Sequence, residues 1–171
     1  MPPELTPEEL EKVRQLFQWA RSGDPQLAMV LDAGYPANLV NQAGDSLLML
    51  AAYHGRHDTA RALLRHGADP GRVNDRGQTP LAGACFKGDL AMVRLLLEHG
   101  TQPNQRLPDG KTALMFAAMF NRVEVMRLLL QHGADPHAED AGGLTAFALA
   151  QKMNAQEAER FLEELEPGGE R

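Results

Sequence analysis

Glycine recurs at one fixed spacing along the chain, and this period constrains the fold more than any other feature. Such a period is typical of solenoids, in which each repeat buries its apolar face only by stacking on its neighbours. We therefore expect a stack of similar units that presents an extended surface. The series are Gly44, Gly77, Gly110 and Gly143; Gly34, Gly67, Gly100 and Gly133; and Gly55 and Gly88, with Asn121 at the next step.

The register of these glycines divides the whole chain, 1–171, into units of one domain with no insertion between them. We expect three full repeats flanked by two cap units, because the end units of a solenoid need a polar outer face. The expected units are an N-terminal cap at about 7–40, repeats at 41–73, 74–106 and 107–139, a C-terminal cap at 140–165 and a disordered tail at 166–171.

Each unit carries the same local signals, which predict two short helices. Thr79 follows a turn glycine as an N-cap residue, and Pro80 takes the first helical position, where its missing N–H costs nothing. The second helix has apolar residues at i, i+3 and i+4 and ends in a pair such as His66 and Gly67, with the glycine left-handed. Because such short helices do not persist alone, stability must come from stacking.

Composition and charge narrow the possible partners. The net charge is −6, and no basic stripe is present, so we expect no nucleic-acid binding. Apolar runs fall far short of the roughly 20 residues that span a bilayer, so we expect no membrane insertion. One cysteine excludes an internal disulfide framework. The N-terminus shows no signal peptide, which favours a cytoplasmic protein.

The sequence resembles the ankyrin-repeat family over about 10–165, in a form similar to short bacterial members. The motifs that carry the resemblance are NDRGQTPL at 74–81, the Ala-Ala pairs, and a Leu-Leu pair followed by HGADP within 63–70 and 129–136. The resemblance implies an all-α solenoid of stacked helix-turn-helix units with β-hairpin or turn fingers. The family's TPLH tetrapeptide lacks its histidine here, since that position holds Met49, Ala82, Met115 and Ala148.

Three patterns suggest chemistry, but each has a simpler structural explanation. Gly110-Lys111-Thr112 imitates the end of a phosphate-binding loop, yet the glycine that such a loop needs five residues earlier is absent. Cys85 stands where other repeats have a small buried alanine, so we expect an inert thiol.

Histidines that recur at the repeat period are the third pattern. Stacking would hold neighbours about 10 Å apart, too far to share a zinc ion. Their place in a last helical turn instead suits hydrogen bonds to the final carbonyls. These histidines are His66, His99 and His132. We therefore expect no enzyme, no catalytic residue, no cofactor and no metal.

The resemblance also implies where a partner binds, because ankyrin partners usually meet the finger tips and the exposed end of each first helix. On those helices Tyr53, Phe86 and Met119 form a series, one member to each repeat. Aromatic and methionine side chains in such places are typical of interface hot spots. The alternative is that Phe86 and Phe120 fill the core. The candidate partner-binding residues are Tyr53, His54, Phe86, Lys87, Met119 and Phe120 on the helices, and Asp45, Asp75, Arg76, Gln78, Asp109 and Lys111 on the fingers.

Together these features predict a non-enzymatic module that binds one protein partner through a concave groove and the finger tips. One alternative is a bacterial inhibitor, immunity or accessory protein of a toxin or enzyme. Another is a self-associating scaffold. We expect a monomer, with a homodimer as the alternative.

Overall fold

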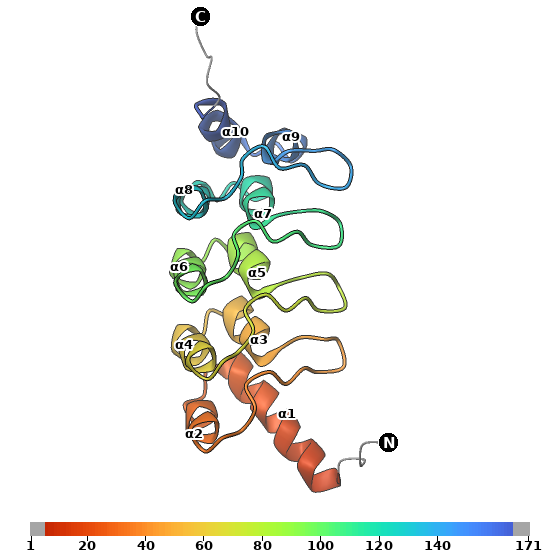
Figure 1. The fold of residues 1–171 in the computed structure, drawn as a ribbon, viewed down its shortest axis with the longest axis vertical. Helices are drawn as coiled ribbons and strands as arrows, with labels where there is room; N and C mark the ends of the chain where they lie inside the picture. The colour runs from red at the N-terminus through yellow and green to blue at the C-terminus, as the bar shows by residue number, and fades with distance from the viewer. Residues whose placement is uncertain (1–5, 166–171) are drawn as a thin grey trace, which may run out of the picture.

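The computed structural model describes residues 6–165, which form ten helices joined by short loops (Figure 1). The predicted tail at 166–171 lies outside the described residues. The helices are α1 (Pro7–Ser22), α2 (Gln26–Asp32), α3 (Leu47–Tyr53), α4 (His57–Arg65), α5 (Pro80–Lys87), α6 (Leu90–Glu98), α7 (Ala113–Met119), α8 (Val123–Gln131), α9 (Ala146–Lys152) and α10 (Gln156–Glu163).

The helices stack in two columns, and the loops between successive pairs project on one side (Figure 1). One column runs from α1 through α3, α5 and α7 to α9, and each member contacts the next. The other column runs from α2 through α4, α6 and α8 to α10. The predicted all-α solenoid is confirmed.

The helices begin at the predicted caps, with one exception. Thr6 and Glu9 form the reciprocal capping box at the start of α1. Ser46, Thr79 and Thr145 each accept a hydrogen bond from the N–H three residues on, which pairs an otherwise orphan donor. At the start of α7, by contrast, Thr112 Oγ1 is buried without a hydrogen-bond partner.

All four units depart from TPLH at the histidine position, and Ser46, Thr79 and Thr145 are paired nonetheless, so this departure alone does not account for the exception. In α7 a methionine stands where the family has histidine, and Met115 Sδ accepts a weak hydrogen bond from the Thr112 backbone N–H at 3.4 Å. A thioether accepts hydrogen bonds weakly and donates none. Met115 fills space in the core, and the Thr112 hydroxyl is unpaired. In α3, by contrast, Met49 holds the same position and its N–H donates to the Ser46 hydroxyl.

Small side chains let the two columns approach closely. The paired small residues in the middle of α3, α5 and α7 are at most 1% exposed, and Cys85 is one of them. Burial raises the pKa of the Cys85 thiol, which agrees with the expected inert side chain. The fully buried leucines of the second column, Leu63, Leu96 and Leu129, keep the repeat period and form the continuous core.

The histidines of the second column pair with backbone carbonyls, as the sequence predicts. Nδ1 of His66, His99 and His132 lies 2.8, 2.9 and 2.9 Å from the carbonyl oxygen four residues earlier. The next residue is a left-handed glycine, for example Gly67 with a φ of 82°. These imidazoles therefore pair with carbonyl groups in the last turns of their helices.

The loops on the finger side form four tight turns, which we call fingers 1 to 4 (41–45, 74–78, 107–111 and 140–144). Within 6–165 their strand-like pairing is limited to one bridge, between Val40 and Ser46. The Asp75 N–H donates to the backbone carbonyl oxygen of Ala43 at 3.1 Å, which joins fingers 1 and 2. The Ala141 N–H donates to the backbone carbonyl oxygen of Asp109 at 3.0 Å, which joins fingers 3 and 4. Pro108 stands at the equivalent position of finger 3 and has no N–H, so the described residues show no backbone hydrogen bond between fingers 2 and 3.

Candidate functional site

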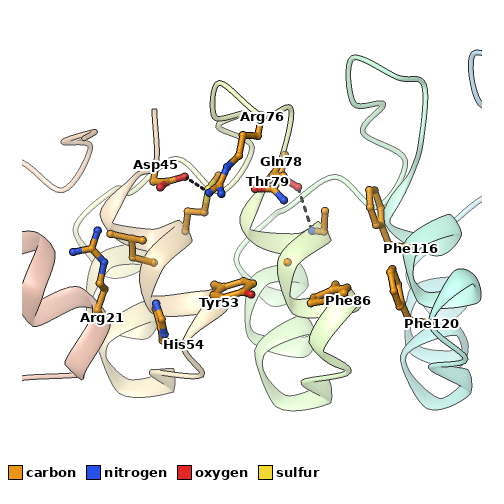
Figure 2. Close-up of a pocket in the computed structure, with 14 residues that line it drawn as sticks. Arg21, Asp45, Tyr53, His54, Arg76, Gln78, Thr79, Phe86, Phe116 and Phe120 are labelled. Atoms are coloured by element: carbon orange, nitrogen blue, oxygen red, sulfur yellow. Dashed lines mark hydrogen bonds and ion pairs between the residues drawn. The ribbon is translucent and has the colours of Figure 1, made fainter. Parts of the chain in front are cut away.

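A groove of about 560 Å³ crosses the first helix column next to the fingers. Its floor is the side of α5 that carries Ala82 and Gly83, and its walls come from α3 and α7 (Figure 2). The surface that lines it is mostly apolar. It is therefore a hollow with aromatic walls, which is the kind of surface that takes a partner's side chain.

The hollow exists because α5 carries two small residues where its neighbours carry large ones. Gly83 corresponds to Leu50 in α3 and Phe116 in α7, and Ala82 corresponds to Met115. The backbone does not demand a glycine here, since Gly83 is helical and an added Cβ would only touch the Tyr53 ring at 3.7 Å. Glycine inside a helix costs about 0.5–1 kcal/mol relative to alanine, so the hollow is made at some cost in stability.

Four aromatic rings surround the hollow (Figure 2). Tyr53 and Phe86 are 43% and 37% exposed. Phe86 and Phe120 meet edge to face, with ring centroids 4.6 Å apart and planes at 86°. Phe116 is half-buried against the core, whereas neither Phe86 nor Phe120 belongs to it. The two outer phenylalanines thus form part of an accessible surface, and the geometry does not favour their use as core filler.

Basic side chains gather at the α1 end of the groove. Arg21, His54 and Lys87 stand at the ends of α1, α3 and α5. His54 and Lys87 directly precede the left-handed Gly55 and Gly88, whereas Arg21 lies two residues before Gly23. Partial burial and the nearby charges of Arg56, Arg21 and Lys87 lower the pKa of His54. The Lys87 Nζ lies 4.4 Å from the centroid of the Tyr53 ring. Across residues 6–165, no carboxylate forms an ion pair with Arg21, Arg56 or Lys87.

The finger side of the groove differs from the expectation at one residue. Asp45 was expected on an exposed finger, but it is only 7% exposed. Its Oδ1 accepts hydrogen bonds from Asn74 Nδ2 at 2.7 Å and Arg76 Nη2 at 3.3 Å, so it ties finger 1 to finger 2. Arg76 and Gln78 are exposed and line the groove beside it.

Five of the candidate residues lie outside this groove. Met119 is half-buried and packs against the core, which breaks the expected series with Tyr53 and Phe86. Lys111 is also half-buried, with Nζ 2.8 Å from Asp109 Oδ2 and 3.9 Å from Asp140 Oδ2. The five residues outside the groove lining are Lys87, Met119, Asp75, Asp109 and Lys111; the seven within it are Tyr53, His54, Phe86, Phe120, Asp45, Arg76 and Gln78.

The sequence analysis missed the residues that give the groove its depth. Gly83 breaks a column of large side chains, a signal that appears when equivalent positions of the repeats are compared. Phe116 precedes Phe120 by four residues, a spacing that places both on one helix face. The lining residues that were not anticipated are Arg21, Met49, Leu50, Thr79, Ala82, Gly83 and Phe116.

Residues 6–165 hold no cluster of three or more histidine, cysteine, aspartate or glutamate side chains arranged to bind a metal. The same part of the chain has no helix long and apolar enough to cross a bilayer.

Comparison with known proteins agrees with the repeat pattern. A family model described as "Ankyrin repeats (3 copies)" matches 16–106, and one described as "Ankyrin repeats (many copies)" matches 96–150. A curated ankyrin repeat protein of the bacterium Pseudomonas aeruginosa is 58% identical over 60 residues, and the match covers 34% of this chain and 35% of that protein. The chain thus matches about a third of the length of this relative. Ankyrin repeats generally mediate protein–protein interactions and are generally non-enzymatic. The chain belongs to the ankyrin-repeat family.

Proposed function

We propose that this chain is a non-enzymatic interaction module that binds one protein partner in the groove over α5. The observation that carries the proposal is the hollow at Gly83, which is walled by exposed aromatic rings and open to solvent. Exposed Tyr53 and Phe86 leave apolar surface in water, and covering it with a partner's side chain is favourable.

The groove is suited to rigid display. Its walls stand on helices that are held on both sides by neighbouring repeats, so little conformational entropy is lost when a partner binds. The Phe86 and Phe120 rings support each other edge to face, which further restricts their motion. Arg76 and Gln78 add a polar rim on the finger side, where hydrogen bonds would fix the partner's register.

Affinity capture from a lysate of the source organism tests this proposal. The bait is the wild-type chain beside a groove variant with Tyr53→Ala, Phe86→Ala and Phe120→Ala. The matched control is a variant with Met29→Ala, Tyr35→Ala and Met153→Ala, because these exposed apolar side chains lie outside the groove. Circular dichroism verifies that each variant is folded.

We expect one protein to be captured by the wild type and the control and lost by the groove variant. Capture by all three baits would place the binding site elsewhere and contradict the proposal. Self-association is tested in the same series by light scattering: a dimer that the groove variant abolishes would mean that the groove binds a second copy of this chain rather than a different protein.

A further inference from the structure

The charges beside the groove indicate what kind of partner segment it takes. The chain as a whole is acidic, with a net charge of −6, yet Arg21, His54 and Arg56 gather at the α1 end of the groove, and Lys87 lies over the nearby Tyr53 ring. We propose that the groove binds an acidic linear segment of a partner, which seats a bulky apolar side chain over Ala82 and Gly83 and directs carboxylates to Arg21, His54 and Lys87. This inference rests on the proposed function and adds the chemistry of the partner.

The basic side chains beside the groove stand close enough to influence one another's charge. They come from the ends of three successive helices, and each helix end by itself favours one positive charge through its dipole. That local effect does not explain their mutual influence: the pKa of His54 is lowered by burial and then by the charges on three different elements, Arg56, Arg21 and Lys87. The part of this lowering that comes from the three neighbouring charges indicates a positive potential at His54, which attracts an anion.

Among the described residues, the arginine and lysine side chains of this group also lack a counter-charge. Within residues 6–165, no carboxylate pairs with Arg21, Arg56 or Lys87. The groove has one acidic lining residue, Asp45, whose Oδ1 already accepts from Asn74 and Arg76. The Arg56 Nε donates to the Arg21 carbonyl oxygen at 2.8 Å, which leaves the guanidinium charge uncompensated. Carboxylates of a bound segment would supply the missing counter-charge.

Tyr53 connects the apolar floor to these cations. The edge of its ring lies 3.7 Å from where a Cβ on Gly83 would stand, and the Lys87 Nζ lies over the same ring at 4.4 Å. A side chain seated on Gly83 would therefore touch Tyr53, and its neighbours in the segment would reach Lys87 and His54. One short segment can satisfy both features, which is why we infer a linear peptide rather than two separate contacts.

The two ends of the groove also differ in their basic side chains. This difference predicts the order of acidic and apolar residues in the bound segment. The positions of His54 and Lys87 correspond to Phe120 in α7, so an aromatic ring takes the place of a basic side chain there. The basic residue beyond that helix end, Arg122, lies outside the groove lining, with its Nε 3.3 Å from the Phe86 carbonyl oxygen. Carboxylates are thus expected over α1 and α3, and apolar side chains between α5 and α7. The preference is for acidic residues on one side of the apolar anchor.

A random library of 16-residue peptides displayed on phage, selected on the immobilised full chain, tests the inference. Selected peptides are then measured by fluorescence anisotropy against wild type, Gly83→Leu, Lys87→Glu and Arg94→Glu. Gly83→Leu fills the hollow with the residue that α3 has at Leu50, and it removes a helix-weakening glycine, so folding is favoured. Arg94→Glu is the matched charge control, because this exposed arginine lies on α6 in the other column.

We expect peptides that combine a large apolar residue with aspartate or glutamate on one side. Their affinity should fall about tenfold or more in Gly83→Leu and several-fold in Lys87→Glu, with Arg94→Glu unchanged. Binding should weaken as salt is added. In an NMR titration the bound carboxylates should raise the pKa of His54, a response that a purely structural role of the cations would not produce.

The other outcomes separate this inference from the proposed function. Neutral or basic peptides that are lost in Gly83→Leu would overturn the acidic partner and leave groove binding in place. Peptides that bind Gly83→Leu as well as wild type would overturn both. An empty selection would overturn the linear segment, while capture of a protein from the lysate by wild type and not by the groove variant would still support the proposed function.

Discussion

Helices α5 and α7 occupy equivalent places in neighbouring repeats, but α5 forms the floor of the hollow and α7 forms one of its walls. Ala82 and Gly83 in α5 form the floor of the groove at the positions where α7 has Met115 and Phe116. Both helices follow a threonine cap and start at the same point of the repeat, so the difference lies in their side chains. A solenoid therefore gains a specific site by departing from its own repeat, not by adding a new element.

The fingers show the same contrast between equivalent joints. Fingers 1 and 2 are tied by a backbone hydrogen bond and by the Asp45 carboxylate, and fingers 3 and 4 by a second backbone bond. Pro108 removes that bond from the joint between fingers 2 and 3, where its ring packs near Gly77 instead. The finger residues that line the hollow over α5 are Asp45, Arg76 and Gln78, so the hollow lies beside the hydrogen-bonded joint between fingers 1 and 2.

The largest expected effect compares two turn glycines. Gly110 and Gly77 both have a positive φ, of 79° and 74°. A Cβ on Gly110 would lie 2.5 Å from the Ala141 backbone nitrogen, whereas on Gly77 it would meet the Pro108 ring at 3.3 Å. We expect Gly77→Ala to lower the free energy of unfolding by about 1–2 kcal/mol and Gly110→Ala to lower it by more. Urea denaturation of both variants measures this, and equal losses would contradict the account of the finger joints.

Next in size is the contrast between the two threonine caps. Thr79 Oγ1 accepts from the Ala82 N–H at 3.2 Å, whereas Thr112 Oγ1 is buried and unpaired. Thr79→Val should therefore cost about 1 kcal/mol of unfolding free energy, and Thr112→Val should be close to neutral or stabilising. Urea denaturation of both variants measures the two changes in unfolding free energy. A larger loss at Thr112 than at Thr79 would show that its hydroxyl is paired in solution.

A smaller and opposite effect is expected at the floor of the groove. Gly83→Ala should raise the free energy of unfolding by about 0.5–1 kcal/mol, because alanine restricts the unfolded chain and its Cβ has room beside Tyr53. The same variant makes the hollow shallower and should weaken partner binding. A variant that is less stable and binds the partner unchanged would contradict the claim that Gly83 costs stability and forms the partner-binding hollow.

The smallest effect distinguishes the two ends of the groove by pH. Because the pKa of folded His54 is lowered, its neutral form is favoured by folding. Its contribution to stability is therefore complete above the ordinary histidine pKa of about 6.5 and is lost as pH falls through the lowered value. Lys87→Met should move the pKa of His54 back towards its ordinary value in an NMR titration, since it removes one repelling charge. Phe120→Leu, at the α7 end of the groove, removes no charge and should leave the pKa of His54 unchanged.

Local signals made the architecture predictable from sequence. A threonine before a proline, a His-Gly pair at a helix end and an unbroken period each act within one repeat. They therefore indicated the two-helix unit, the caps and the stacking without knowledge of neighbours. Thr112 is instructive, because its type and position predict a cap, but its hydroxyl is buried and unpaired, unlike those of Ser46, Thr79 and Thr145.

The groove was only partly predictable, because it depends on side chains from three repeats. Tyr53 and Phe86 were identified correctly as exposed, from their place after the small-residue pairs. Met119 was expected beside them, yet it packs against the core, and Phe116 occupies the wall instead. Asp45 is buried by Asn74 and Arg76, which lie 29 and 31 residues away, a contact that no local pattern contains.

Site-specific photo-crosslinking in a lysate of the source organism tests the central claim that a protein partner binds the groove over α5. A photoreactive phenylalanine replaces Phe86 in one sample and Arg94, on the opposite helix column, in another. The account predicts one prominent adduct from position 86, no corresponding adduct from position 94, and loss of the adduct when Gly83→Leu is added. An adduct from position 94 alone, or one from position 86 that persists in Gly83→Leu, would contradict it.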